Sequence, residues 1–278
     1  MALSILNNIP SLVAQNNLSI TNANLQKTLF RLSSGSRINS GADDAAGLAI
    51  ADGLHANVTA LTQSAQNASA GVGALQVADG ALAQVTTLLN RAVTLATEAS
   101  TGTVSSSQQV ALDAEFTQIK AEVDRIGSTT TFNGTSVFTA TTTSIFLSDA
   151  NSSSQIGVTV GTVTSAAITY NGSTANVSSD ALTSTVAAQT ALTHIDTAIA
   201  NVAGIRGSIG AGINRLQSAV NVINNQVQNL TSAEDGIRAA DIPSEVANLS
   251  RFTMLNQAGI SSLAQANSAQ QSVLTLLR

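Results

Sequence analysis

The sequence lacks several residue types, and each absence excludes a class of protein. The 278 residues contain no cysteine and no tryptophan, aromatic residues make up 3% of the chain, and proline occurs twice. A chain without cysteine has no disulfide scaffold, thiol nucleophile or zinc–thiolate site. Because aromatics are scarce, the core must be built from Ala, Leu, Val and Ile, and the scarcity of proline permits very long helices.

Charge is also scarce, at 10% of residues against about 25% in an average protein, and the formal net charge is −5. This acidic balance argues against nucleic-acid binding, which requires a basic face. No stretch approaches the roughly 20 consecutive apolar residues of a membrane span. Residues 1–12 lack the basic and long apolar segments of a secretory peptide. We therefore expect no nucleic acid and no membrane as a partner, and no cleaved signal peptide.

Apolar residues near the N-terminus recur with the spacing of one helical face. The row consists of Leu18, Leu25, Leu29 and Leu32, at intervals of seven, four and three residues. A seven-residue recurrence predicts bundle or coiled-coil packing. We expect this helix to stop at Gly35, and we expect Asp43 and Asp44 to cap the next helix.

From residue 43 to residue 100 the apolar steps alternate between three and four, which predicts a helix on the order of 85 Å long. Asp79 and Thr86 interrupt its seam, and Gly71 and Gly73 are expected to weaken or bend it. A second, shorter seam follows a turn at 101–103, and its members are Leu112, Phe116, Ile119, Val123 and Ile126. The charged residues between 113 and 125 are interpreted as a solvated helix face.

Residues 128–190 are rich in serine and threonine, and their apolar periodicity falls toward two. The pairs Asn133-Gly134 and Asn171-Gly172 favour tight hairpin turns. They predict short strands such as 144–147, 156–160 and 166–170. We interpret this segment as a small β-rich lobe, and partial disorder is the alternative.

The cleanest seam runs from Leu192 to Leu230 and is broken only by Arg206. We expect a polar connector at 232–241, which contains Gly236, and then a final helix with Pro243 in its first turn. Six apolar residues of that helix share one heptad frame: Val246, Leu249, Ile260, Leu263, Leu274 and Leu277. Polar residues on the same frame lower stability and fix the register.

These patterns predict a mainly α fold, a long antiparallel helical bundle or coiled-coil rod with a small β-rich hairpin lobe in the middle of the chain. The predicted divisions are 1–42, 43–127, 128–190, 191–235 and 236–278. The two terminal segments have narrow, interrupted apolar faces, so a lone pair of such helices is marginal in water. We expect the ends to be loosely ordered in the free chain and to become ordered on assembly.

Several long motifs of this sequence resemble those of bacterial flagellins. In the N-terminal part they are Asn16-Asn17-Leu18, Arg31-Leu32-Ser33-Ser34-Gly35, Arg37-Ile38-Asn39-Ser40 and Asp43-Asp44-Ala45-Ala46-Gly47. In the C-terminal part they are Gln257-Ala258-Gly259, Leu263-Ala264-Gln265-Ala266-Asn267 and Val273-Leu274-Thr275-Leu276-Leu277-Arg278. Several long motifs in the right order are a specific signal, and the resemblance covers roughly residues 1–138 and 190–278.

The resemblance implies an extracellular subunit of the flagellar filament, which polymerises with copies of itself for swimming motility. In such a subunit 1–42 and 236–278 would form the inner core, 43–127 and 191–235 the surrounding shell, and 128–190 a lobe facing solvent. The subunit-packing residues would be the leucines from Leu18 to Leu32 and the apolar residues from Val246 to Leu277 named above. The alternatives are a hook–filament junction protein and a secreted, type III translocator-like helical protein.

The same resemblance implies further partners. Such subunits leave through the flagellar type III export channel, an export chaperone binds their C-terminal segment, and hook-associated and cap proteins adjoin them. Relatives are sensed by a mammalian Toll-like receptor through the shell helices. The matching positions here are Arg91 as a charged donor, Leu95 as an apolar anchor and Glu115 as an acceptor.

Nothing in the sequence indicates an enzyme. The two histidines, His55 and His194, have no partners at metal-ligand spacing, and residues 128–190 contain no histidine and no glutamate. No phosphate-binding loop, nucleophile elbow or metal motif is present. We therefore expect a structural protein without a cofactor.

Overall fold

The computed structural model describes residues 8–148 and 154–276, which form five helices and seven short strands. The chain divides into two compact units. We name residues 1–56 and 229–278 the terminal unit, and residues 57–228 the central unit. The predicted fold, mainly helical with a small β-rich lobe in the middle of the chain, is confirmed.

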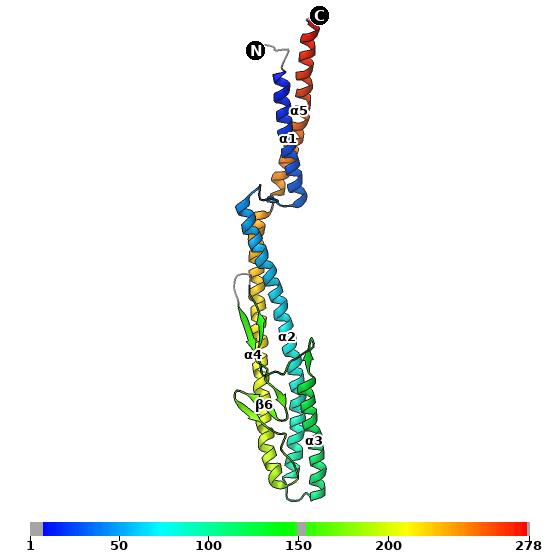
Figure 1. Ribbon diagram of the computed structural model, residues 1–278, viewed down its shortest axis with the longest axis vertical. Helices are drawn as coiled ribbons and strands as arrows, with labels where there is room; N and C mark the ends of the chain where they lie inside the picture. The colour runs from blue at the N-terminus through cyan, green and yellow to red at the C-terminus, as the bar shows by residue number, and fades with distance from the viewer. Residues whose placement is uncertain (1–7, 149–153, 277–278) are drawn as a thin grey trace. The chain divides into compact units, whose positions relative to one another are not determined.

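Two helices from opposite ends of the chain form the terminal unit. Helix α1 spans Ile9–Ser34 and helix α5 spans Ile242–Leu276, and they lie side by side (Figure 1). Helix α1 ends where predicted, because Gly35 adopts a left-handed conformation with φ of 69° that glycine tolerates without strain. Pro243 lies in the first turn of α5, where its missing N–H leaves no hydrogen bond unmade.

The central unit takes its core from three helices. Helix α2 spans Ala45–Ala99, α3 spans Ser106–Thr129 and α4 spans Thr185–Arg238. The beginning of α2 and the end of α4 belong to the terminal unit. The predicted seams supply the fully buried side chains, among them Leu82 of α2, Phe116 of α3 and Ile195 of α4. The seams therefore face one another inside a single chain, as their spacing predicts.

Seven strands form three small antiparallel sheets between α3 and α4. The sheets are β1 (Thr131–Phe132) with β2 (Thr135–Ser136), β3 (Thr143–Phe146) with β4 (Gln155–Val158), and β5 (Val163–Thr164) with β6 (Ala167–Tyr170) and β7 (Ser173–Ala175). Both predicted Asn-Gly pairs connect hairpins, and all four of their residues have positive φ, which asparagine and glycine tolerate best.

The lobe is tied to α3 by charged side chains, so the predicted solvated face of that helix is wrong in part. The carboxylate of Asp124 accepts hydrogen bonds from the backbone N–H of Ser165 at 2.6 Å and from its hydroxyl at 2.8 Å. The carboxylate of Asp113 accepts a hydrogen bond from the backbone N–H of Leu182 at 2.6 Å. The ammonium group of Lys120 donates a hydrogen bond to the carbonyl of Asp180 at 2.6 Å. These residues satisfy lobe backbone groups that no strand pairs. The acidic and basic residues left on the solvent side of α3 include Glu115, Glu122 and Arg125.

One helix prediction needs correction. Residues 232–238 are not a polar connector, because α4 continues through Gly236 to Arg238. Polar residues with one glycine are compatible with a helix when neither proline nor a capping motif intervenes. Helix α2 is continuous through Gly71 and Gly73, and the expected weakening or bending at these glycines stays a prediction. A Cβ atom on Gly71 would collide with the side chain of Ile145 in β3, so this glycine provides room for the lobe.

The two charged residues that interrupt the long seams are partners. Asp79 of α2 and Arg206 of α4 form a two-pronged ion pair, with N–O distances of 2.8 Å and 3.3 Å. The aspartate raises the pKa of the Arg206 guanidinium, mainly through the hydrogen bond between them. The two interruptions therefore join α2 to α4 rather than weaken both helices.

Among the described helices, α2 is the one long and apolar enough to cross a membrane, with a mean hydropathy of 1.2 over its most apolar 18 residues. A single such helix is weak evidence for a membrane span, because the core helix of a soluble protein passes the same test. Its residues Leu75, Leu82 and Leu89 are buried within the central unit. The apolar composition of α2 is thus used in packing.

Candidate functional site: the outer faces of the terminal helices

Large hydrophobic side chains are exposed mainly on the terminal unit. Among the described residues, twelve of the eighteen exposed large hydrophobic residues belong to it. They are Ile9, Leu12, Val13, Ile20, Leu29, Phe30, Ile50, Ile242, Val246, Met254, Leu255 and Ile260. By contrast, the described hydrophobic residues that are buried in this unit are Ile38 and Ala51. An apolar surface of this extent on one helix pair is typical of an interaction surface.

The predicted subunit-packing residues divide between two environments. Half-buried residues line the contact between α1 and α5, and these are Leu18, Leu25, Leu32, Leu249 and Leu263. Exposed residues lie outside it, and these are Leu29, Val246 and Ile260. Leu274 lies in α5, and Leu277 lies outside the described residues. The helical spacing therefore identified the seam within one chain together with part of a second, outward surface.

Sequence reasoning missed several residues of that outward surface. Ile9 and Leu12 of α1 are 62% and 66% exposed, and Met254 of α5 is 64% exposed. At about 100° per residue, these side chains point away from the row of leucines that faces the partner helix. The number of apolar residues in each helix could have revealed them. A single contact seam needs one apolar face, and each of these helices carries two.

The contact between α1 and α5 is narrow and partly polar. The side chain of Leu18 lies against Gly259, where a Cβ atom would come within 3.2 Å of it. The hydroxyl of Ser11 donates to Asn267 at 2.9 Å, the amide of Asn8 donates to the carbonyl of Ala266 at 3.2 Å, and the amide of Asn256 donates to Asn22. These polar contacts fix the register of two antiparallel helices and leave most apolar side chains facing outward.

An ionic cluster holds the end of α1 to its neighbours. Lys27 contacts Asp43 at 2.7 Å, and Arg31 contacts both Asp43 at 3.7 Å and Glu245 of α5 at 3.3 Å. The hydrogen bond from Lys27 lowers the pKa of Asp43 to about 2. Asp43 therefore orders the connector instead of capping α2, and the cap is Asp44 alone, which accepts from the N–H of Gly47 at 2.9 Å.

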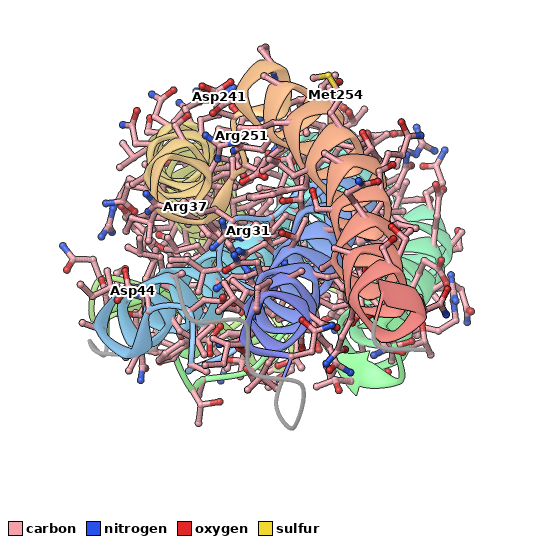
Figure 2. The ribbon with its side chains drawn as sticks, turned by 90° about the horizontal axis from the view of Figure 1, so that it is seen from above. Arg31, Arg37, Asp44, Asp241, Arg251 and Met254 are labelled. Carbon is pink, nitrogen blue, oxygen red and sulfur yellow. The ribbon has the colours of Figure 1, made fainter. Side chains whose placement is uncertain are left out.

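The two connectors of the terminal unit are joined by backbone hydrogen bonds. The N–H of Arg37 donates to the carbonyl of Arg238 at 2.7 Å, and the N–H of Ala240 donates to the carbonyl of Gly35 at 2.9 Å. Figure 2 shows Arg31 toward the centre of this unit and Met254 at its outer edge. The end of α1 is thus fixed at its base, while the outer face of the helix is exposed in the part of the chain that the structure describes.

The predicted receptor residues lie in the central unit. The guanidinium of Arg91 donates to both carboxylate oxygens of Glu115, at 2.7 Å and 3.0 Å, and both side chains are about half exposed. This hydrogen bonding raises the pKa of Arg91 and lowers that of Glu115. Leu95 is 1% exposed. The structure therefore joins the two charged residues on the surface and places the leucine in the core.

The histidines contact carboxylates on other elements. His194 Nδ1 lies 2.9 Å from Asp180, and His55 Nδ1 lies 3.3 Å from Glu234. Within residues 8–148 and 154–276, no three His, Cys, Asp or Glu side chains come together in a way that could hold a metal ion. Both histidines thus have neighbours suited to packing and ion pairing.

Comparison with known proteins shows which family this chain resembles. The bacterial flagellin N-terminal helical region matches residues 5–143, and the bacterial flagellin C-terminal helical region matches residues 192–277. The chain is 38% identical over 272 residues to a flagellin of Halalkalibacterium halodurans, with 98% of each chain covered. It is 34% identical over 284 residues to a flagellin of Listeria monocytogenes, with 97% of this chain and 98% of the relative covered.

A solved structure is similar in fold. It is a Vibrio parahaemolyticus protein described as a flagellar hook-associated protein, with a TM-score of 0.58 and 14% identity, and the match covers 71% of this chain and 100% of the other. At that identity the likeness extends to the helical fold alone.

Proposed function

Because the chain belongs to the bacterial flagellin family and is a structural subunit of the extracellular flagellar filament, we propose that the outer faces of α1 and α5 form the contacts between copies of this chain. The observation that supports this proposal is the concentration of exposed large hydrophobic residues on these two helices. The prediction of a non-enzymatic filament protein that serves motility is confirmed. Because relatives named flagellin cover nearly the whole chain, we prefer this function to a junction protein or a translocator.

The energetics favour assembly through these faces. Burying one exposed Leu, Ile or Met side chain stabilises a contact by about 1.5–3 kcal/mol. The α1–α5 pair alone buries little, so its helices gain more from neighbouring copies than from each other. We assign 1–42 and 236–278 to the inner core of the filament, 43–127 and 191–235 to the shell, and 128–190 to the solvent-facing lobe.

Substitution of exposed residues tests the proposal. Ile20→Asp and Ile260→Asp place a charge on the outer faces of α1 and α5, and we expect each to raise the critical concentration for filament formation strongly. Val186→Asp is the matched control, because Val186 is 73% exposed but lies in the central unit. Filaments are quantified by sedimentation and negative-stain microscopy, and circular dichroism of the monomers checks that the helices form.

Two results would count against the proposal. One is normal assembly of both terminal variants, and the other is an equal loss of assembly with Val186→Asp. Removal of about 35 residues from each end is a coarser version of the experiment, and it must abolish filaments if the terminal helices carry the contacts.

The same outer face of α5 suits a partner before assembly. A chain that is exported through the type III channel needs its exposed apolar C-terminal segment covered, and Met254, Leu255 and Ile260 are exposed apolar side chains of α5 that a chaperone would cover. We include an export chaperone at this segment, and hook-associated and cap proteins at the filament ends, among the proposed partners. Protection of 242–276 from proteolysis by the purified chaperone would test the first.

Recognition by a host Toll-like receptor is proposed through Arg91 and Glu115. Both are exposed polar groups on neighbouring helices, and Leu95 would support them from the core rather than act as an exposed anchor. The expected result is that Arg91→Ala weakens receptor activation by monomers while Arg125→Ala, which removes another exposed, ion-paired arginine of the central unit, does not. Equal effects of the two substitutions would contradict a specific role for Arg91.

A further inference from the structure

Most charged residues of the terminal unit are neutralised within the chain. Lys27 and Arg31 contact Asp43, Arg31 also contacts Glu245, and Arg238 contacts Asp52 and Glu234 at 3.6 Å. Arg37 is an exception, because it forms no ion pair among the described residues and instead donates a hydrogen bond to the backbone carbonyl of Ile237 at 2.9 Å. Such pairing is expected where a surface becomes buried, because an unpaired charge that loses its water is costly.

Arg251 is a basic residue that does not follow this pattern. Its guanidinium donates to the side chain of Asn248 at 3.1 Å and lies 5.0 Å from the ring of Phe252, and it contacts no carboxylate among the described residues. Met254 and Leu255, three and four residues further along α5, share its helical face and are exposed. A neighbour that covers these two apolar residues therefore also lies close to Arg251.

Two acids that lack a basic partner flank the connector between α4 and α5. Asp235 lies in the last turn of α4, where the partial negative charge of the helix end disfavours a carboxylate. Asp241 precedes α5 and accepts from the N–H of Ser244 at 3.4 Å. Both are exposed, and neither contacts a Lys, Arg or His in the part of the chain that the structure describes. We name Asp235 and Asp241 the acidic corner.

Arg251 cannot reach the acidic corner of its own chain along α5. Ten residues of helix separate Arg251 from Asp241, which corresponds to about 15 Å at 1.5 Å per residue. Among the described residues, the terminal unit thus carries an arginine without an ion pair beside exposed apolar residues, and two acids without a basic partner at the connector between α4 and α5. Charges of opposite sign, far apart in one copy, suit a contact that repeats from copy to copy.

We propose that in the filament Arg251 of one copy binds the acidic corner of a neighbouring copy, an inference that rests on the proposed function. Each copy then offers its arginine to one neighbour and its corner to another, the head-to-tail arrangement that builds an open helical polymer. The planar guanidinium can donate two parallel hydrogen bonds to one carboxylate of the acidic corner. The apolar faces supply most of the stabilisation, and the ion pair fixes which register of the two copies is accepted.

Charge reversal tests this pairing on the full chain. Arg251→Glu and Asp235→Arg each set like charges against one another at every such contact, and we expect each to raise the critical concentration for assembly by at least about tenfold. The double variant R251E/D235R restores opposite charges and is expected to assemble within about threefold of the unchanged protein. Asp241 stays unchanged in all variants, because it accepts a hydrogen bond at the start of α5.

Two controls separate pairing from damage. Arg251→Lys keeps the charge and is expected to assemble nearly normally, and circular dichroism of each monomer must match that of the unchanged chain. An equimolar mixture of the two single-reversal proteins is expected to form filaments at concentrations where neither does alone, because alternating copies then match at every contact.

Two results would overturn the proposed pairing of Arg251 with the acidic corner. Normal assembly of both single variants would overturn the proposal, and so would impaired single variants whose defect persists in the double variant, since Arg251 would then meet something other than the acidic corner. These results leave the assignment of the outer faces to assembly intact, because that assignment depends on the separate Ile20→Asp and Ile260→Asp experiment.

Discussion

The terminal and central units are built from helices of the same kind, yet they differ in where their apolar side chains lie. Both use long helices rich in Ala, Leu and Val. In the central unit three seams meet, and Leu82, Phe116 and Ile195 are fully buried. In the terminal unit two helices meet across one seam, and residues such as Leu12 and Met254 are exposed. The same apolar spacing forms a buried core in the central unit, where three helices pack together. It leaves an exposed apolar surface on α1 and α5, which pack mainly against each other.

A second difference concerns how the helices are held together. The central unit adds a β lobe that fits against its helices at glycines, since a Cβ on Gly204 of α4 would collide with the ring of Tyr170. Asp113 and Asp124 then bind lobe backbone groups directly. The terminal unit instead relies on a few polar contacts between α1 and α5 and on the ionic cluster at the base of α1. The central unit is therefore complete within one chain.

The largest effect that would separate the two units is truncation of a central aromatic. Phe116 is fully buried, so Phe116→Ala is expected to lower the free energy of unfolding by about 3–5 kcal/mol. Phe30→Ala, at a terminal position that is exposed, is the comparison and is expected to change it by less than about 0.5 kcal/mol. Thermal unfolding of monomers measures both. Equal losses would break the contrast between a closed and an open unit.

The lobe anchor gives the next largest effect. Asp124→Ala leaves the N–H and hydroxyl of Ser165 without their acceptor, and we expect a loss of about 1–3 kcal/mol in unfolding free energy. Glu122→Ala, on the solvent side of the same helix, removes an exposed ion pair with Arg125 and is expected to cost less than about 1 kcal/mol. If both substitutions behaved alike, the lobe would not be held by Asp124.

The ion pair between the long helices contributes less. Asp79 and Arg206 are both 40% exposed, so removal of either side chain is expected to cost less than about 1 kcal/mol. A double-mutant cycle of Asp79→Ala and Arg206→Ala, measured by denaturant unfolding at low and high salt, isolates the coupling between them. The coupling should fall as salt rises, and a coupling that is insensitive to salt would argue that the two residues act through packing instead.

A pH effect tests the ionic cluster of the terminal unit. Because Lys27 holds the pKa of Asp43 near 2, below the value of about 3.9 in an unfolded chain, the charged carboxylate stabilises the fold fully above pH 4. This contribution is lost as the pH falls from about 4 to about 2, where Asp43 takes up a proton. Lys27→Met removes the main cause of the shift, so the difference in unfolding free energy between wild type and variant should shrink over that range. A difference that stayed constant with pH would contradict the role of the pair.

How far the sequence predicted the structure depends on how local each interaction is. The end of α1 at Gly35, the two Asn-Gly hairpins and the seams of α2, α3 and α4 were predictable, because a few neighbouring residues determine each of them. The roles of Asp113 and Asp124 were not, because their partners lie 69 and 41 residues away. The contact of Gly71 with Ile145 was not predictable either, because Ile145 lies 74 residues further along the chain.

The exposed apolar surface of the terminal helices was predictable only in part. Spacing predicts Leu29, Val246 and Ile260 as subunit-packing residues, and all three are exposed in the single chain, while their contacts between copies stay a prediction. It could not say which apolar residues pack within one chain and which await another copy, because both sets obey the same period. It also could not place Leu95 in the core beside an exposed pair of charged residues, since that depends on how α2 and α3 meet.

Amide hydrogen exchange can be compared between monomers and filaments. We expect the amides of α1 and α5 to exchange rapidly in the dilute monomer and to become strongly protected in the filament. Amides around Phe116 in α3 should be protected in both states. Equal protection of α1 and α5 before and after polymerisation would contradict the claim that their outer faces are completed only by neighbouring copies.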